Sequence, residues 1–123
     1  MRVLIADDDI VSRRVLEKRL TTAGYEVEVA CDGEQALARL RAPNPPKLAL
    51  LDWMMPKMDG PALFRQMKLR PETSSLPVVF ITAKASQHDL DELLRLGAAG
   101  AISKPFSPKD LPDQLRAIWA KLP

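Results

Sequence analysis

The chain has 123 residues, of which 46% are hydrophobic and 28% are charged, as is usual for one globular domain with its own core. Eighteen Lys and Arg against sixteen Asp and Glu leave a formal net charge of +2, too small and too evenly spread to favour direct binding of nucleic acid. The sequence has no apolar stretch of membrane-spanning length and no charged-then-apolar leader. The single cysteine, Cys31, excludes an internal disulfide. We therefore expect one cytoplasmic domain over residues 1–123 that does not bind a membrane.

The N-terminal part predicts a strand, a helix and a second strand. Residues 2–6 form an apolar strand that runs straight into Asp7, Asp8 and Asp9. A helical pattern follows and ends at Gly24, and its apolar side comprises Val11, Val15, Leu16 and Leu20. Residues 25–30 alternate, with Val27 and Val29 facing inward, which is typical of a half-solvated strand at a sheet edge.

The middle of the chain places one apolar run between two helices. Asp32 and Gly33 turn the chain into a helix over about 34–41, and a further helix opens at Gly60 and Pro61, because proline is tolerated in the first turn. Between them the apolar run 48–51 ends abruptly in one carboxylate, Asp52. Such a run, bounded by turn residues, is typical of a parallel strand covered on both faces.

The C-terminal part continues the alternation. Residues 78–81 predict a strand that ends in Thr82, and residues 100–103 predict one that ends in Lys104. The helix between them would be capped by Ser86 and end at Gly97, with Leu90, Leu93 and Leu94 facing inward. Because Pro112 lies within the last helical pattern, that helix is either kinked or begins later than Pro108.

Five strands that alternate with five helices predict a doubly wound α/β fold with a five-stranded parallel sheet of flavodoxin-like order 2-1-3-4-5. In that order a set of polar residues converges on the carboxyl edge of the sheet: Asp7, Asp8, Asp52, Thr82 and Lys104. Three clustered carboxylates repel one another and raise their own pKa values, and a hard divalent cation removes that conflict. Oxygen-only ligands favour Mg²⁺. A lysine and a hydroxyl beside such a carboxylate suit a transferred phosphoryl group.

The order and spacing of these residues resemble the receiver domain of two-component response regulators, which has a CheY-like fold. The resemblance covers nearly the whole chain and rests on Asp7-Asp8, Asp52, Met55-Pro56, Met58-Asp59-Gly60, Thr82-Ala83 and Lys104-Pro105-Phe106. It implies a phosphorylation-activated signalling switch rather than a turnover enzyme. Asp52 would accept a phosphoryl group, with Mg²⁺ as cofactor, from the phosphohistidine of a sensor histidine kinase or of a phosphotransfer protein.

The resemblance also implies a role for each matched position. The carboxylates of Asp7, Asp8 and Asp52 and the backbone carbonyl of Met54 would hold the metal. The phosphoryl group would be contacted by Thr82, Lys104 and the backbone of Ala83 and Trp53, and Pro105 would follow a cis peptide bond. Asp9 lies outside the matched pair and is interpreted as a helix cap.

Two further positions in the family tune the hydrolysis of the acyl phosphate, and here they are Met54 and Lys84. We expect Met54 to shield the acyl phosphate from water. One departure concerns the residue three before the lysine, usually an aromatic side chain that changes rotamer with the threonine. Ala101 stands there and is interpreted as a small core residue. A dimer or output partner at the face made by the fourth helix, fifth strand and fifth helix would then sense packing changes alone.

Other functions share parts of this pattern. A hydrolase with an aspartyl-phosphate intermediate needs a second acid two residues past the nucleophile, where Met54 stands. A flavin site needs a phosphate-cradling loop after the first strand, where an acidic cluster would repel the phosphate. Two alternatives stay open: a pseudo-receiver that binds partners without phosphorylation, and a receiver that forms part of a larger regulator or hybrid kinase.

Overall fold

The structure is a computed structural model that describes residues 2–82, 87–104 and 107–121. Within them the strands are β1 (Arg2–Ala6), β2 (Glu26–Ala30), β3 (Leu48–Asp52), β4 (Val78–Thr82) and β5 (Gly100–Ser103). The helices are α1 (Ile10–Thr22), α2 (Gly33–Arg41), α3 (Gly60–Lys68), α4 (Gln87–Arg95) and α5 (Leu111–Ala120). The strands form one parallel sheet in the order β2-β1-β3-β4-β5. The fold predicted from the sequence is confirmed.

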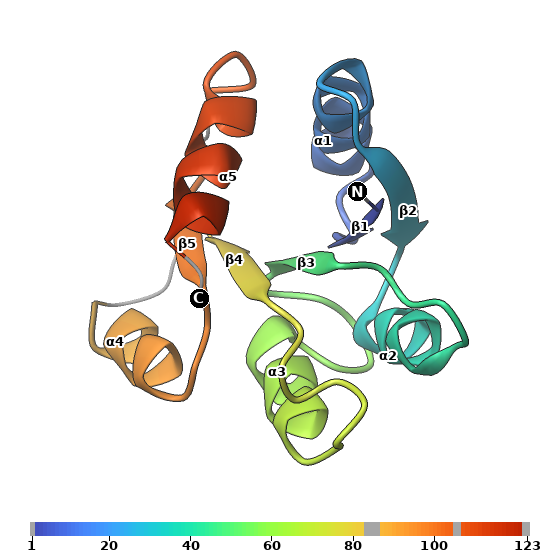
Figure 1. The fold of residues 1–123 in the computed structure, drawn as a ribbon, viewed down its shortest axis with the longest axis vertical. Coiled ribbons are helices and arrows are strands. Elements are labelled where there is room, and N and C mark those ends of the chain that lie inside the picture. The colour runs from blue at the N-terminus through green and yellow to red at the C-terminus, as the bar shows by residue number, and fades with distance from the viewer. Residues whose placement is uncertain (1, 83–86, 105–106, 122–123) are drawn as a thin grey trace.

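Helices cover both faces of the sheet. Figure 1 shows α1 and α5 on one face and α2, α3 and α4 on the other. Each face has its own buried cluster, because alternate side chains of a strand point to opposite faces. The α1/α5 side is packed by Val3, Ile5, Leu16, Leu20, Leu48, Leu50, Val79, Ile81, Ile102, Leu111 and Leu115. The central strands β3 and β4 are buried along their whole length, as expected of strands covered on both faces.

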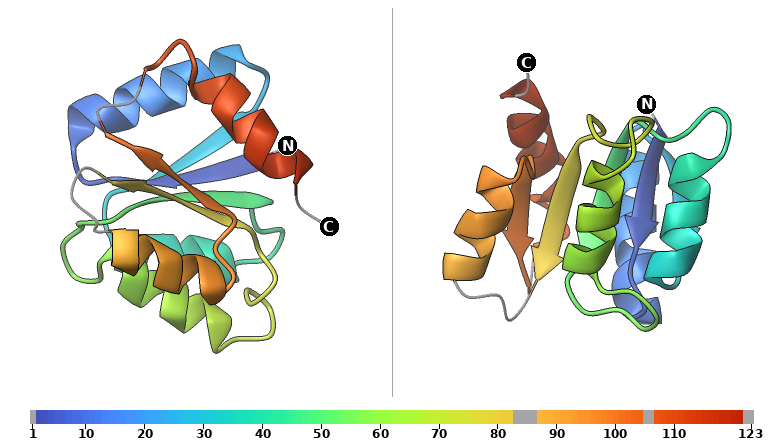
Figure 2. Two further views of the ribbon diagram at one scale, coloured as in Figure 1. Left: turned by 90° about the vertical axis from the view of Figure 1, so that its left-hand side faces the viewer. Right: turned by 90° about the horizontal axis from the view of Figure 1, so that it is seen from below.

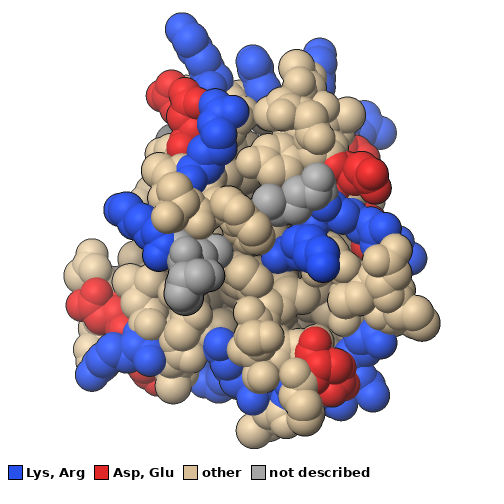
Figure 3. All heavy atoms as spheres, in the orientation of Figure 1, with Lys and Arg blue, Asp and Glu red and all other residues tan. Residues whose placement is uncertain are grey.

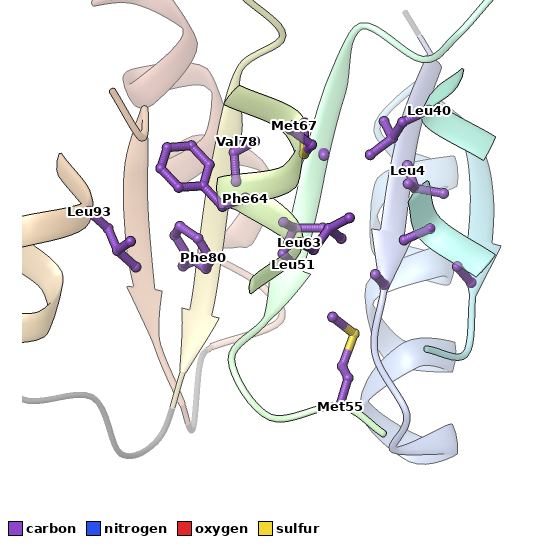
Figure 4. Close-up of a cluster of buried hydrophobic side chains, with 14 residues drawn as sticks. Leu4, Leu40, Leu51, Met55, Leu63, Phe64, Met67, Val78, Phe80 and Leu93 are labelled. Carbon is purple, nitrogen blue, oxygen red and sulfur yellow. The ribbon is translucent and has the colours of Figure 1, made fainter. Parts of the chain in front are cut away.

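The second cluster, on the side of α2, α3 and α4, centres on aromatic side chains. In Figure 4, Phe64 of α3 and Phe80 of β4 lie close to each other in this cluster. Their ring centroids are 5.6 Å apart in an edge-to-face arrangement, and the ring of Trp53 lies 5.5 Å from that of Phe80. Trp53, which directly follows Asp52, is therefore half-buried against the core.

Three helices begin at an aspartate whose side chain accepts a backbone N–H of the first turn. Asp9 accepts from Val11, Asp32 from Gln35, and Asp59 from Ala62. The predicted cap at Asp9 is confirmed. The last helix begins at Leu111, later than Pro108, and Pro112 lies in its first turn, where a missing N–H is tolerated.

Four apolar or small side chains were assigned to the interior wrongly. Val11 is 67% exposed, Val29 39% and Leu94 43%, and Ala101 is also exposed. β2 and β5 are the edge strands, so a neighbouring strand covers them on one side only. For the same reason α4, which packs beside β5, buries only Leu93 completely (Figure 1). Cys31, which follows β2, is exposed as well.

The molecular surface mixes both signs of charge. On the face shown in Figure 3, Lys and Arg side chains are interspersed with Asp and Glu. This distribution agrees with the small net charge of +2. In the described part of the chain, no helix has the length and apolar character needed to cross a membrane.

Candidate functional site

The parallel sheet brings the predicted site residues to one edge. Asp7 directly follows β1, Asp52 ends β3 and Thr82 ends β4. Lys104 directly follows β5, and its backbone N–H donates to the carbonyl of Thr82 at 2.8 Å. In Figure 2 (right), the arrowheads of the blue β1 and the yellow β4 point to the same edge of the sheet. The predicted convergence of these residues is thereby confirmed.

The three carboxylates form a compact cluster. One oxygen from each of Asp7, Asp8 and Asp52 lies within 4.8 Å of the other two. Asp7 and Asp52 are buried, with 1% and 9% of their surface exposed, whereas Asp8 is exposed. Lys104 faces the cluster, with its Nζ 3.2 Å from Asp7 Oδ2 and 3.4 Å from Asp52 Oδ2. One ammonium group thus pairs with two of the three carboxylates, and the cluster keeps an excess of negative charge.

The surroundings of the cluster shift the pKa values of Asp52 and Lys104. Burial raises the pKa of Asp52 to about 6, and the charge of Asp7 and a hydrogen bond with Asp7 act in the same direction. Lys104 acts in the opposite direction. Burial alone would lower the pKa of Lys104, but the neighbouring Asp7 and Asp52 carboxylates outweigh it and raise that pKa. Lys104 is therefore a fixed positive charge, and the ionised form of Asp52 is disfavoured.

Hydrogen bonds hold the segment that follows β1. The Asp9 N–H donates to Asp7 Oδ1 at 2.9 Å, and the Asp7 N–H donates to the Ala30 carbonyl at 3.2 Å. Arg13 Nη1 lies 3.1 Å from the Asp7 carbonyl and 3.2 Å from Cys31 Sγ. Arg13 was not among the predicted site residues, because a basic residue on a helix surface gives no signal of a contact with a distant strand end.

The loop between β3 and α3 directly follows Asp52. Met54 is 64% exposed, whereas Met55 is buried, and Figure 4 shows the Met55 side chain pointing from the loop toward the core cluster. The backbone N–H of Trp53, expected at the phosphoryl group, instead donates to the Ile81 carbonyl at 3.1 Å. In this conformation that N–H is not available to a ligand.

Several predicted positions lie outside the described residues. These are Ala83, Lys84 and Ser86 after β4, and Pro105 and Phe106 after Lys104. Their sequence-based roles stay predictions. Thr82, by contrast, is described and is buried at the end of β4.

Comparison with known proteins identifies what this arrangement is similar to. Residues 3–116 match the family model of the response regulator receiver domain. Among solved structures, the chemotaxis response regulator CheY4 of Vibrio cholerae is 32% identical, with a TM-score of 0.86 over 95% of this chain and 97% of that one. The Francisella response regulator 1452 receiver domain is 30% identical, with a TM-score of 0.83 over 98% of this chain and 97% of that one.

Curated relatives extend beyond the matched region. The probable transcriptional regulator ycf27 of Cyanophora paradoxa is 40% identical over 117 residues, which are 95% of this chain and 47% of that protein. The phosphate regulon transcriptional regulatory protein PhoB of Pseudomonas aeruginosa is 37% identical over 116 residues, 94% of this chain and 50% of that protein. The chain thus spans about half the length of the curated relatives it matches.

Proposed function

The chain belongs to the response regulator receiver domain family, and on that premise we propose that it is a phosphorylation-controlled signalling switch whose phosphoryl acceptor is Asp52. The observation that carries the proposal is the contact between the Asp52 carboxylate, the buried Asp7 carboxylate and the Lys104 ammonium at the carboxyl edge of the sheet. Members of this family are signalling domains rather than classical enzymes. The reaction would therefore occur once per signalling cycle.

The chemistry is a phosphoryl transfer between two nucleophiles. A carboxylate oxygen of Asp52 attacks the phosphorus of a phosphohistidine, the P–N bond breaks, and its electron pair returns to the imidazole of the donor. Lys104 lies close enough to Asp52 to neutralise negative charge on the transferred group. The Thr82 hydroxyl and the Ala83 N–H would donate hydrogen bonds to it. Attack of water on phosphorus later breaks the new P–O bond, releases inorganic phosphate and restores the carboxylate.

The acidic cluster fits a divalent cation. Its donors are carboxylate oxygens alone, and the Lys104 ammonium pairs with only two of the three carboxylates, which leaves uncompensated negative charge. Asp7, Asp8, Asp52 and the Met54 carbonyl would hold Mg²⁺. When bound, Mg²⁺ would neutralise charge on the phosphoryl oxygens and on the carboxylates.

The surroundings of the site suit a protein as phosphoryl donor. Ile10 and Val11 are exposed in the first turn of α1, directly after the Asp7–Asp9 segment, and Met54 is exposed in the loop after Asp52. Exposed apolar side chains beside a charged centre are typical of surfaces that contact another protein. We infer that a histidine kinase or phosphotransfer protein docks over these residues.

The signal would leave through the face formed by α4, β5 and α5. The relatives' names describe transcriptional regulators, so an output domain or a second copy is the partner we propose there. Ala101 and Ser103 on β5 are exposed at this sheet edge. With alanine at position 101, the transmission would depend on shifts in packing rather than on an aromatic rotamer change.

The proposal is tested by intact mass after incubation with Mg²⁺ and acetyl phosphate. The wild-type protein is expected to gain one phosphoryl group, and both Asp52→Asn and the addition of a chelator are expected to prevent the gain. A wild-type protein that gains no mass and also fails to bind beryllofluoride would instead be a pseudo-receiver.

A further inference from the structure

The loop between β3 and α3, residues 53–59, directly follows Asp52 and carries Met54. The sheet and α3 hold its two ends, where Trp53 donates to Ile81 and the Gly60 N–H donates to the Trp53 carbonyl at 3.0 Å. Its middle leaves the sheet and passes through Lys57, whose φ of 69° is unusual for a residue with a side chain. Besides the buried side chain of Met55, the middle of the loop has a further support.

The first turn of α2 supplies that support. A Cβ added to Gly33 would lie 2.1 Å from the Met58 carbonyl oxygen and 2.6 Å from the Met58 Cβ. The loop backbone thus rests directly on the backbone of Gly33, at a distance that any larger residue would prevent. Because the opposing atom is a backbone carbonyl, no change of side-chain rotamer can make room.

Asp32 adds a charged contact beside Gly33. Its Oδ2 lies 3.7 Å from Lys57 Nζ, and its Oδ1 accepts the Gln35 N–H at 2.8 Å. The Asp32 side chain is buried, so its place is set by the helix that it caps. The same carboxylate therefore starts α2 and faces the loop that follows the acceptor.

We propose that Asp32 and Gly33 are positioning residues for phosphoryl acceptance, which act by holding loop 53–59 against the start of α2. We call this contact the α2 seat: Asp32 and Gly33 against Lys57 and Met58. The inference rests on the proposed function, because it concerns the geometry of that same acceptor site. Transfer reactions are sensitive to such geometry, and a misplacement of about 1 Å can lower a rate on the order of a hundredfold.

The test compares two glycine substitutions. Gly33→Ala forces the loop away from α2, whereas Gly24→Ala strains a left-handed residue (φ 100°) that has no atom within 4 Å of an added Cβ. Both variants are expected to lose stability, but only Gly33→Ala is expected to accept a phosphoryl group from acetyl phosphate more slowly, by about tenfold or more. Equal rates in the two variants, at temperatures where both are folded, would overturn the positioning role.

A second readout needs no phosphoryl donor. Amide hydrogen exchange of Met54, Met55, Lys57 and Met58 is expected to become faster in Gly33→Ala and to stay at the wild-type rate in Gly24→Ala. Unchanged exchange in Gly33→Ala would mean that the seat does not hold the loop. If the wild-type protein neither accepts a phosphoryl group nor binds beryllofluoride while exchange still increases in Gly33→Ala, the proposed function fails and the mechanical contact stands.

Should Gly33→Ala fail to fold, Asp32→Asn provides the milder variant. Asparagine preserves the helix cap but removes the charge that faces Lys57. We expect a smaller increase of exchange at the same four loop residues and a smaller loss of acceptance rate. Wild-type values for both quantities would contradict the role of Asp32.

Discussion

The neighbouring groups that would make Asp52 reactive also destabilise its ionised form. It is buried, it faces the Asp7 carboxylate, and Lys104 compensates only part of the charge, so its pKa is raised to about 6. The ionised form that would attack phosphorus is therefore the form that the folded protein disfavours in the absence of a cation. Any ligand that brings positive charge close to the Asp52 carboxylate therefore stabilises its ionised form.

The first prediction concerns stability against pH in a chelating buffer. Because the folded-state pKa of Asp52 lies above its ordinary value of 3.8, its contribution to stability is fully present below pH 3.8 and is lost as the pH rises through about 6. The Asp52→Asn variant has no carboxyl group at this position to ionise, so it does not lose this contribution and is expected to be more stable than wild type at pH 7.5. The difference should shrink as the pH falls to 4. Denaturant midpoints measure it, and a constant difference across this range would contradict the raised pKa.

The second prediction concerns Met54, which is exposed in the loop that follows Asp52. We propose that its thioether side chain keeps water from the acyl phosphate, whereas an amide would hydrogen-bond a water molecule there. Met54→Asn is expected to shorten the half-life of the phosphorylated protein several-fold, as followed by loss of mass after removal of the donor. Met54→Leu keeps an apolar cover and serves as the control. An unchanged half-life in Met54→Asn would refute the shielding.

At the scale of elements, the sequence pattern predicted the strands well because β3 and β4 are buried on both faces and have no polar interruptions. The pattern wrongly predicted that Val29 and Leu94 are buried, because the burial of a side chain near the edge of a sheet depends on which neighbouring segments cover it. It identified Asp32-Gly33 only as a turn. The contact of Gly33 with Met58 joins two segments that are distant in sequence, and no local pattern reports it.

The third prediction tests the aspartate that starts α3. Asp59 Oδ1 accepts the Ala62 N–H at 2.8 Å and marks where the acceptor loop ends and the helix begins. Asp59→Ala is expected to lower the free energy of unfolding by about 1 kcal/mol. Asp59→Asn, which retains a capping oxygen, is expected to stay close to wild type. Equal losses in both variants, measured by chemical denaturation, would show that the charge rather than the cap is responsible.

At the scale of the whole molecule, the site joins parts of the chain that are far apart in sequence. Asp7 follows β1, Asp52 ends β3 and Lys104 follows β5. The contacts of Lys104 with Asp7 and with Asp52 therefore each join the ends of two different strands. Repulsion among the carboxylates opposes this assembly, while the ammonium supports it. The stability of the entire domain is thus linked to the charge gathered at one edge.

The last prediction follows from this linkage. A cation that binds the folded cluster and not the unfolded chain stabilises the domain by about 1.4 kcal/mol at ten times its dissociation constant. Mg²⁺ is therefore expected to raise the denaturation midpoint of the wild-type protein, and a chelator should reverse the change. Asp7→Asn should abolish the effect, because Asp7 is the most deeply buried member of the cluster. Asp9→Asn removes a neighbouring carboxylate that caps α1 and lies outside the cluster, so it should preserve the effect. Equal Mg²⁺ responses in these two variants would mean that the cation acts through general surface charge rather than through Asp7, Asp8 and Asp52.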